Sequence, residues 1–437
     1  MIKKFKIIVL AITTTSLCFT WGCSGKPSIK ENKSTSSYEE SSKTNDKKDV
    51  ELKLWSWFSL GNQLKKFESE NKGIKIKEEL FSFDKCKEEY TKALFSGEGP
   101  DIFVFDSSFF GQYTTNNTLL DLLQEPFSAG KYQKDFIGWD SGLSLDKKQL
   151  LSLTISTSPY ITMYRADIMK ENGFPSEPNE FGKFIEKPEN IMKLAKKLFE
   201  TKKYILQYPT DLADITEATL GFFDDNLNYI CTGDLFEKSL DIGIEVKRNG
   251  MMSNVNFWGE DGKKAILENK IVMVPAPSYG MTTLKRDAPE QKGKWRVTKA
   301  PLGSVAWASD SRMAINSQSS FKLQAWKFME YITTQKDNNG SDYTIVSGYI
   351  PSHKDKRNMD QKDEYFGGQN IYPMLEDLSE KMVQHKLTPL DSKALEIYRN
   401  DVWSAVQGKL SSSDVAAKMK QEIEIATNEQ KRDLLMK

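Results

Sequence analysis

The sequence is poor in histidine and carries no net charge. With only His353 and His385 present, a site built from several histidines and a histidine-dependent catalytic triad are both disfavoured. The 61 basic and 61 acidic side chains cancel and form no evident basic patch, which argues against nucleic acid as a partner. We therefore predict no catalytic residue, no metal and no other cofactor, although the abundant carboxylates leave open an enzyme that uses a pair of acids.

Cysteine is also scarce, and its spacing is not that of a disulfide scaffold. Cys18 and Cys23 lie near the amino terminus. Cys86 shares a helical face with Tyr90, Ala93 and Leu94, so we expect it to be buried as a small apolar side chain. The sequence leaves open the state of Cys231 and whether either interior thiol is modified.

The first 22 residues have the features of a secretory signal. Basic residues precede a short apolar run, Ile7–Phe19, which is too short to span a bilayer. Gly22-Cys23 resembles the end of the lipobox of bacterial lipoproteins, although Thr20 stands where leucine is usual. This resemblance implies that Cys23 is lipidated and becomes the new amino terminus. The alternative is a plain secreted protein that is cut nearby.

Residues 23–49 are rich in serine, lysine and glutamate and are too polar to fold. A flexible tether of about 25 residues has a root-mean-square reach of about 25–30 Å. No later stretch is apolar enough to span a membrane. We expect a lipid anchor on the extracellular face of the cell membrane. The remaining chain, about 390 residues, is long enough for two domains.

The folded part begins with alternating strand and helix patterns. This β-α-β-α-β order predicts an α/β fold with a parallel sheet covered by helices. The predicted elements are a strand from Val50 to about Ser56, a helix with Leu60, Leu64 and Phe67 on one face, a strand at 74–77, a helix at 84–96 capped by Asp84, and a strand at 102–105.

Later segments add further strands and several helices. A strand is predicted at 150–156; Ser158-Pro159-Tyr160 breaks it, and it resumes at 161–164. Two further strands are predicted at 271–274 and 312–315. The helical periodicity of 321–332 predicts a helix that packs on the core, and 392–407 and 412–428 predict two more.

The strand at 102–105 ends on Asp106-Ser107-Ser108. In open α/β sheets, ligands bind just beyond the carboxyl ends of the strands, so Asp106 is a candidate ligand contact. The alternative is that Asp106 or Ser107 caps a helix, and the two roles are compatible.

Four segments together resemble the bacterial extracellular solute-binding proteins of ABC sugar importers, the class that includes maltose-binding protein. The order and spacing of the segments carry the resemblance, which spans most of residues 50–437. The segments are Gly97–Ile102, Ser158–Asp167, Arg312–Asn316 with the following Ala325–Ile332, and Ser347–Pro351.

The resemblance implies a periplasmic-binding-protein-like fold: two α/β lobes, a hinge crossed more than once, and a cleft between the lobes. Lobe one would comprise 50–155 plus 312–350, and lobe two 156–311 plus 351–437. The ligand would be a carbohydrate, closure would present the protein to the permease subunits of the importer, and we expect a monomer.

Sugar recognition needs aromatic rings for the apolar sugar faces and polar groups for the hydroxyls. Core packing and capping are the competing roles for each candidate. One departure from the family pattern is Ala276–Tyr279, where glycine, serine or proline, and tryptophan are frequent. The candidate ligand-binding residues are Trp57, Asp106, Tyr160, Trp258, Tyr279, Trp307 and Asp310.

Two other functions remain open at this stage. One is a cell-surface carbohydrate-active enzyme with paired carboxylates, and the other is a binding protein for a non-sugar solute such as a peptide or polyamine. The sequence names neither the sugar nor its length, and it does not separate an importer subunit from a sensor.

Overall fold

The computed structural model describes residues 49–335, 344–354, 356–408 and 410–436. The predicted signal segment, Cys23 and all of the tether except Asp49 lie outside these residues. None of the described helices is both long enough and apolar enough to cross a bilayer. Cys86 and Cys231 are buried free thiols, which confirms the expectation for Cys86.

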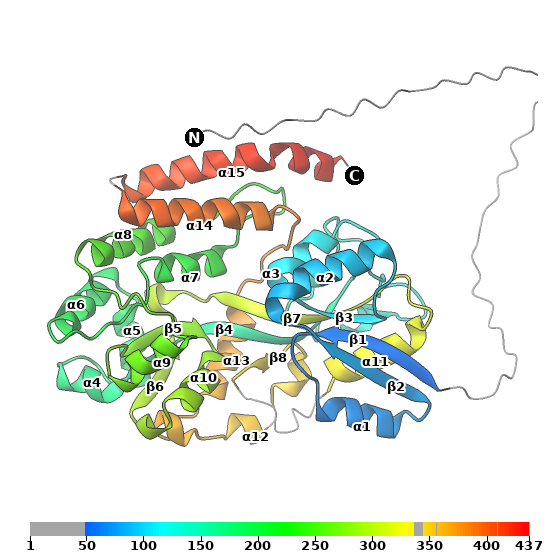
Figure 1. The fold of residues 1–437 in the computed structure, drawn as a ribbon, viewed down its shortest axis with the longest axis horizontal. Coiled ribbons are helices and arrows are strands. Elements are labelled where there is room, and N and C mark those ends of the chain that lie inside the picture. Colours follow the sequence, from blue (N-terminus) through cyan, green and yellow to red (C-terminus); the bar gives the residue numbers. More distant parts are fainter. Residues whose placement is uncertain (1–48, 336–343, 355, 409, 437) are drawn as a thin grey trace, which may run out of the picture. The chain divides into compact units, whose positions relative to one another are not determined.

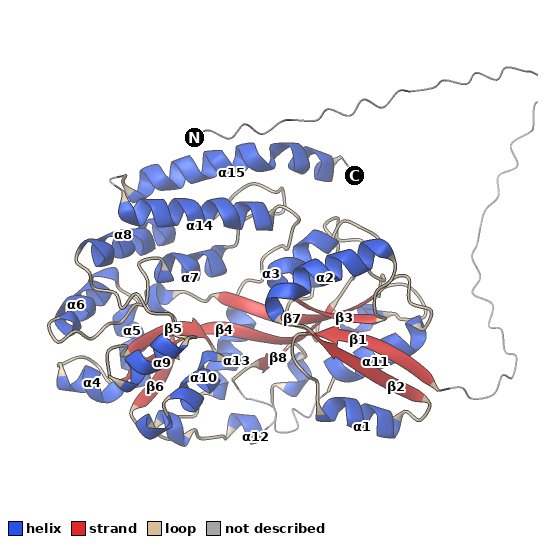
Figure 2. Ribbon diagram, viewed as in Figure 1, coloured by secondary structure: helices blue, strands red, loops and turns tan. Residues whose placement is uncertain are grey.

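The strands form one sheet in the order β2-β1-β3-β7-β4-β5, and β6 and β8 also pair with β4 (Figure 2). This sheet is a curled half-barrel. Its strands are β1 (Val50–Ser56), β2 (Ile74–Leu80), β3 (Ile102–Asp106), β4 (Leu153–Arg165), β5 (Met273–Pro277), β6 (Trp295–Lys299), β7 (Trp307–Ile315) and β8 (Val346–Ser347).

Helices cover the sheet and form additional layers around it (Figure 1). They are α1 (Asn62–Glu70), α2 (Phe83–Ser96), α3 (Ser107–Phe110), α4 (Ala166–Glu171), α5 (Pro178–Ile185), α6 (Pro188–Phe199), α7 (Asp211–Leu220), α8 (Asp234–Arg248), α9 (Glu260–Leu267), α10 (Gly280–Asp287), α11 (Lys322–Thr333), α12 (Lys356–Met359), α13 (Tyr372–Lys381), α14 (Asp391–Gln407) and α15 (Ser412–Leu435).

The predicted parallel arrangement is confirmed for the first three strands only. β1 pairs in parallel with both β2 and β3. β7 and β4 then join the sheet in antiparallel orientation because the chain returns across it from distant parts of the sequence.

Strand β3 is buried on both faces, as its continuous apolar run predicts. Ile102 and Val104 belong to a core that also contains residues of α1 and α11. Phe103 and Phe105 belong to the opposite core, which contains residues of α2 and α3. Figure 1 shows α2 and α3 over one face of this part of the sheet and α1 and α11 over the other.

Two local predictions are corrected in this part of the chain. Ser82, not Asp84, occupies the N-cap position of α2, and Asp84 lies in the first turn, where its charge suits the helix dipole. Strand β7 begins at Trp307 and not at Arg312, because residues 307–311 also pair with β4.

Strand β4 is continuous through Ser158-Pro159-Tyr160, so the predicted break there is wrong. The irregularity is a register shift between Ser158 and Pro159 in the pairing with β7. Proline lacks an amide hydrogen and is tolerated at such a bulge. Before the shift β4 pairs with β7 and β8; from Tyr160 onward it pairs with β5 and β6. One strand therefore connects two regions of the sheet.

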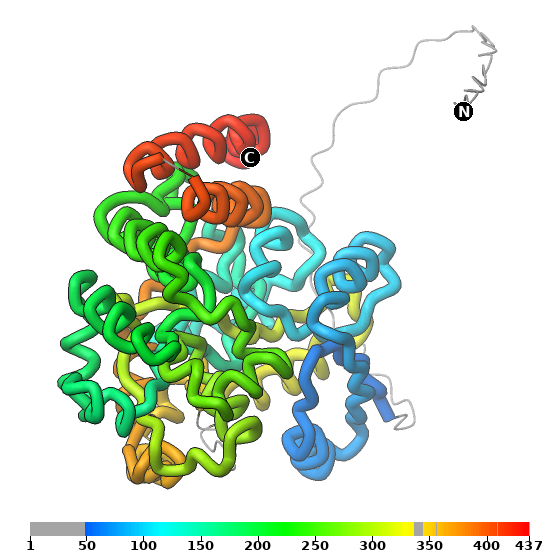
Figure 3. Tube along the Cα trace, turned by 60° about the vertical axis from the view of Figure 1, so that its left-hand side comes forward, coloured from blue at the N-terminus to red at the C-terminus, as the bar shows by residue number. Residues whose placement is uncertain are grey.

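A separate helical layer completes the described part of the chain. Helices α7, α8, α14 and α15 share one apolar core, to which Leu240, Tyr398, Val402 and Met419 contribute. In Figure 3 these helices lie next to one another although α7 and α14 are far apart in sequence. This layer brings the carboxyl-terminal helices beside the middle of the chain.

Candidate ligand-binding site

A cavity of about 290 Å³ lies where β4, β7 and α3 meet the helical layer. Distant segments of the chain contribute to its wall, which explains why its composition is not visible in any one motif. The polar and aromatic lining residues are Ser107, Ser108, Tyr160, Asp214, Glu217, Trp307, His385, Lys386, Asp391 and Arg399.

Two of the predicted aromatic residues, Tyr160 and Trp307, line this cavity. Adjacent strands position them: Pro159 is paired with Trp307, and the Tyr160 amide donates a hydrogen bond to the Ala306 carbonyl over 3.0 Å. Burial, and then the nearby acidic side chains, raise the pKa of the Tyr160 hydroxyl, so it stays protonated and able to donate.

Trp307 is buried, and its ring lies 5.8 Å from the His385 ring. Among the described residues, its indole Nε1 has no hydrogen-bond partner although it is buried. An unpartnered buried donor is costly unless a ligand or water satisfies it. The Trp307 ring therefore lines the cavity, while its indole N–H is left without a hydrogen-bond partner in the described part of the chain.

Helix α7 contributes two carboxylates to the cavity, Asp214 and Glu217. Burial raises the pKa of Asp214 to about 6, against a lowering effect of Arg399. Burial and the Asp214 charge raise the pKa of Glu217 to about 8. Within the described ranges, the Glu217 carboxylate takes part in no hydrogen bond or ion pair. These groups can accept hydrogen bonds from hydroxyls or an ammonium.

Asp106 is the N-cap of α3, as the alternative interpretation predicts. Its Oδ1 accepts a hydrogen bond from the Ser108 amide over 2.9 Å. Burial raises the pKa of Asp106 to about 6, although its hydrogen bonds with Ser108 act in the opposite direction. Asp106 is not among the cavity-lining residues, but the capped turn holds Ser107 and Ser108 in the wall.

Trp258 and Tyr279 form an exposed aromatic pair with ring centroids 5.5 Å apart. Tyr279 follows β5, whose Pro277 is paired with Tyr160. Burial, and then the Asp106 charge, raise the pKa of Tyr279. Tyr279 is therefore close enough to Asp106 for the two side chains to interact electrostatically.

Trp57 packs among aromatic rings and does not line the cavity. Its ring centroid lies 5.3 Å from that of Phe58, 5.6 Å from that of Phe83 and 6.3 Å from that of Phe109. Phe109 belongs to α3, so Trp57 supports the helix that carries Ser107 and Ser108. Its place favours the packing role that was the alternative to a ligand contact.

Asp310 takes part in a buried ion pair and is not among the cavity-lining residues, so the structure lends no support to the predicted ligand contact. Arg312 donates to its two carboxylate oxygens over 2.8 and 2.6 Å, and both side chains are fully buried. The Asp310 amide also donates to Ser107 Oγ over 3.1 Å. Since both oxygens are occupied and inaccessible, the role that this geometry supports is to hold the α3 turn.

Sequence reasoning missed Glu217, Asp214, Arg399 and His385. The acids had a signal: Asp211, Asp214 and Glu217 recur at every third residue and so share one side of a helix. Nothing in the local sequence distinguishes Arg399 or His385 from ordinary helix and loop residues. Arg399 reaches the cavity from α14, and His385 reaches it from the loop before α14, where its Nε2 lies 3.0 Å from the Ala218 carbonyl oxygen of α7.

Residues 62–365 match the family described as bacterial extracellular solute-binding protein. A comparison with curated proteins found no match. A crystal structure of an extracellular solute-binding protein of family 1 is 17% identical, with a TM-score of 0.73, and the match covers 86% of this chain and 99% of the other.

Two sugar-binding proteins have the same fold. The galacto-N-biose/lacto-N-biose I-binding protein of a Bifidobacterium longum ABC transporter is 18% identical, with a TM-score of 0.70 and coverage of 89% of this chain and 99% of the other. The sugar-binding protein MalE of Xanthomonas citri is 14% identical, with a TM-score of 0.70 and coverage of 89% and 100%. Identities this low show the fold alone. The family match and this fold confirm the resemblance: the chain belongs to the bacterial extracellular solute-binding proteins and has their two-lobed α/β fold.

Proposed function

We propose that this protein captures a carbohydrate in the cavity lined by Tyr160 and Trp307 and delivers it to the permease of an ABC transporter. The observation that carries the proposal is the composition of that cavity: two aromatic rings beside unsatisfied hydrogen-bonding groups. Sugars present apolar ring faces and many hydroxyls, which require this combination. The structural relatives supply independent support, since several are described as sugar-binding transporter proteins.

We infer an oligosaccharide from the exposed aromatic pair. Trp258 and Tyr279 lie outside the cavity wall but adjoin it through Tyr160 and β5. An oligosaccharide that places one unit in the cavity would stack a second unit on this pair. Asp106, Trp57 and Asp310 act in this proposal by holding the α3 turn and its two serines.

The proposal includes the division into lobes, with 50–155 and 312–350 in lobe one and 156–311 and 351–437 in lobe two. The apolar clusters support it. Leu52, Val104 and Met329 share one cluster, whereas Tyr164, Leu194 and Met273 share another. The chain passes between these groups within β4 and within β7, where a small rotation would close the cavity.

The location fits the family, whose members are extracellular or periplasmic. We propose that Cys23 carries a lipid and that the tether holds a monomer at the outer face of the membrane. Mass spectrometry of the membrane fraction tests this directly, because a Cys23→Ala variant would lose the lipidated amino-terminal peptide and appear in the medium.

A cationic solute is the second candidate, and the acidic groups on α7 favour it. Asp214 and Glu217 share the cavity wall, and burial disfavours their charged forms. An ammonium group would restore the charged carboxylates. Amino sugars and polyamines both carry such a group. Binding of an amino sugar would also depend on the aromatic rings of the cavity, whereas binding of a polyamine would not.

A thermal-shift screen over neutral sugars, amino sugars and polyamines tests the function, because a ligand that binds only the native state raises the melting temperature. We expect an oligosaccharide to raise it in the wild type and not in Trp307→Phe or Glu217→Gln. The matched control is Trp403→Phe, since Trp403 is exposed on α14 and is not among the cavity-lining residues. New reducing ends during incubation would indicate an enzyme, and a shift unaffected by the cavity variants would place the ligand elsewhere.

A further inference from the structure

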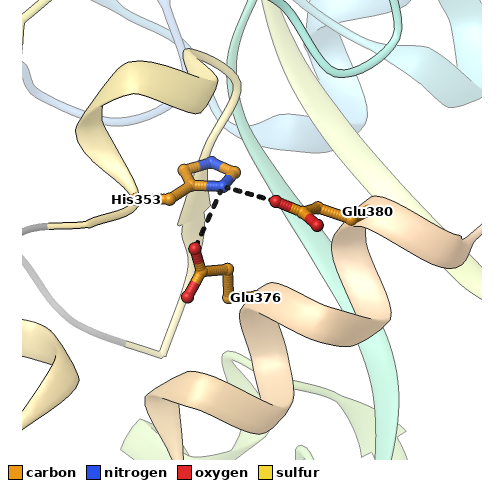
Figure 4. Close-up of side chains that lie close together, drawn as sticks. All are labelled: His353, Glu376 and Glu380. Carbon is orange, nitrogen blue, oxygen red and sulfur yellow. Dashed lines mark ion pairs between the residues drawn. The ribbon is translucent and has the colours of Figure 1, made fainter.

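Three side chains outside the ligand cavity converge on one point. His353 follows the turn at 350–352, and Glu376 and Glu380 lie four residues apart on α13, so they share one face of that helix. Figure 4 shows the His353 ring and both carboxylates directed toward one another. Nδ1 lies 3.9 Å from an oxygen of Glu376 and 3.9 Å from an oxygen of Glu380.

The hydrogen bond on the other side of the ring fixes the tautomer of His353. Its Nε2 lies 2.7 Å from the Ser347 carbonyl oxygen. Because a carbonyl can only accept, Nε2 must carry the hydrogen, and the neutral ring leaves Nδ1 with its lone pair. Metal-binding histidines are commonly oriented in this way by a backbone carbonyl on the second nitrogen.

Nδ1 of His353 faces the two carboxylates but makes no hydrogen bond within the described part of the chain. His353 is 1% exposed, and its Nδ1 is buried without a hydrogen-bond partner among the described residues. At 3.9 Å the carboxylate oxygens are too distant for hydrogen bonds. A buried, oriented nitrogen that faces two carboxylates and bonds to neither is the geometry that a small cation would complete.

We propose that His353, Glu376 and Glu380 bind a divalent transition-metal ion, with Zn²⁺ the best fit. One imidazole and two carboxylates form a nitrogen-and-oxygen donor set that suits zinc, with a fourth position left for water. The candidate ligand atoms all lie within 4.8 Å of one another. Zinc bonds of about 2.0–2.2 Å in a tetrahedron place ligand atoms about 3.4 Å apart, so small rotamer changes would close the site.

The electrostatics and the access route agree with this assignment. Burial, and then the charge of Glu380, raise the pKa of Glu376, while His353 and Lys354 act in the opposite direction. A bound cation would offset the repulsion between the two carboxylates. The Glu380 side chain is 52% exposed, so the ion can enter from solvent on that side. The low histidine count excludes only sites that need several histidines.

A bound ion would connect a central strand to a helix. Ser347, which orients His353, lies in β8 and is paired with Ser156 of β4. The two carboxylates lie on α13. The ion would therefore join β8 to α13 and stabilise the segment where the chain passes near β4. The three residues are absent from the cavity wall, so the proposal does not rest on the proposed sugar binding.

Titration calorimetry with zinc chloride, on chelator-treated full-length protein without a histidine tag, tests the site. We expect one ion per chain, a higher melting temperature with zinc, and at least tenfold weaker binding by Glu376→Gln and Glu380→Gln. Glu380→Gln is the decisive variant, because its half-exposed side chain can be changed without disturbing the core. Cobalt in place of zinc gives a visible absorption spectrum that reports tetrahedral coordination.

Two controls make the result specific. Glu424→Gln removes an exposed glutamate on α15, and His385→Gln removes the only other histidine, so both should keep zinc binding. Equal binding by Glu380→Gln and the wild type would overturn the proposal. So would absence of zinc binding with a stability that depends on pH alone, which would identify an imidazolium–carboxylate ion pair. The sugar-induced thermal shift of Glu380→Gln, measured in parallel, keeps this outcome separate from the proposed function.

Discussion

Asp310 and Glu217 are two carboxylates removed from water in opposite ways. Asp310 is enclosed, and Arg312 satisfies both of its oxygens. Arg312 in turn donates to Ser141, Ser152 and Thr154, so the whole network is closed. Glu217 lines the cavity and, among the described residues, no donor reaches its carboxylate.

The difference separates groups that hold the fold from groups that are available to a ligand. A buried charge with a full set of partners is costly to disturb, because removing one partner leaves the other charge uncompensated. A partly buried carboxyl group without a partner is destabilising in its charged form, and a bound ligand can satisfy it. The comparison indicates that Asp310 holds the fold and that Glu217 is available to a ligand, and four experiments test this difference.

Arg312→Met should destabilise the protein more than the other changes. It leaves Asp310 charged and unpaired, so the free energy of unfolding should fall by about 3–5 kcal/mol in urea denaturation. The double variant Asp310→Asn/Arg312→Met should recover part of this loss, because no unpaired charge remains. If the two variants are equally unstable, packing and not charge pairing explains the effect.

Glu217→Gln should change binding and not stability. A hydrogen bond to a charged group contributes about 1.5–3 kcal/mol, so the dissociation constant for the ligand should rise about 10- to 100-fold in calorimetry. The melting temperature of the empty protein should be unchanged or higher. A clearly lower melting temperature would show that Glu217 belongs to the framework after all.

Gly221→Ala tests the wall of the cavity near Glu217. Gly221 has a φ of 68°, and an added Cβ would lie 2.4 Å from Cγ of His385. We expect a loss of about 1–3 kcal/mol in unfolding free energy together with weaker ligand binding. Gly250→Ala is the matched control, since Gly250 has a φ of 64° with no atom within 4 Å of the added Cβ. Equal losses would mean that backbone strain alone is responsible.

The fourth experiment concerns pH. Burial raises the pKa of Glu217 from 4.5 to about 8, so the folded protein holds this proton more tightly than the unfolded chain. The contribution to stability is therefore greatest below pH 4.5 and declines as pH rises toward about 8. The melting temperature of the empty wild type should fall more between about pH 5 and pH 8 than that of Glu217→Gln. Parallel curves for the two proteins would contradict the raised pKa.

The sequence predicted the local elements of the first half well because their signals are local. Strand β3, with its apolar run after Gly-Glu-Gly-Pro, is buried on both faces, and α11 follows its amphipathic period. The predicted break at Pro159 failed for a tertiary reason: pairing with β7 on one side and β5 on the other keeps β4 extended across the bulge.

The predictions for the candidate site were also right where the signal was local and incomplete where it was not. Tyr160 and Trp307 line the cavity, and the capping alternative for Asp106 is observed. Trp57 and Asp310 carry residue types suited to a ligand, but other side chains occupy them. Phe58, Phe83 and Phe109 pack on Trp57, and Arg312, two residues further along β7, pairs with Asp310. Asp310 and Arg312 share one face of β7, but only the structure shows that both side chains are fully buried.

The strands and helices, the polar strand ends and the family resemblance could be read from the sequence, because apolar periodicity and turn residues act over a few neighbours. Which carboxylates are satisfied and which are available became visible in the folded chain alone. Burial and hydrogen bonding depend on groups brought from far along the chain, as α14 beside α7 and His353 beside α13 show.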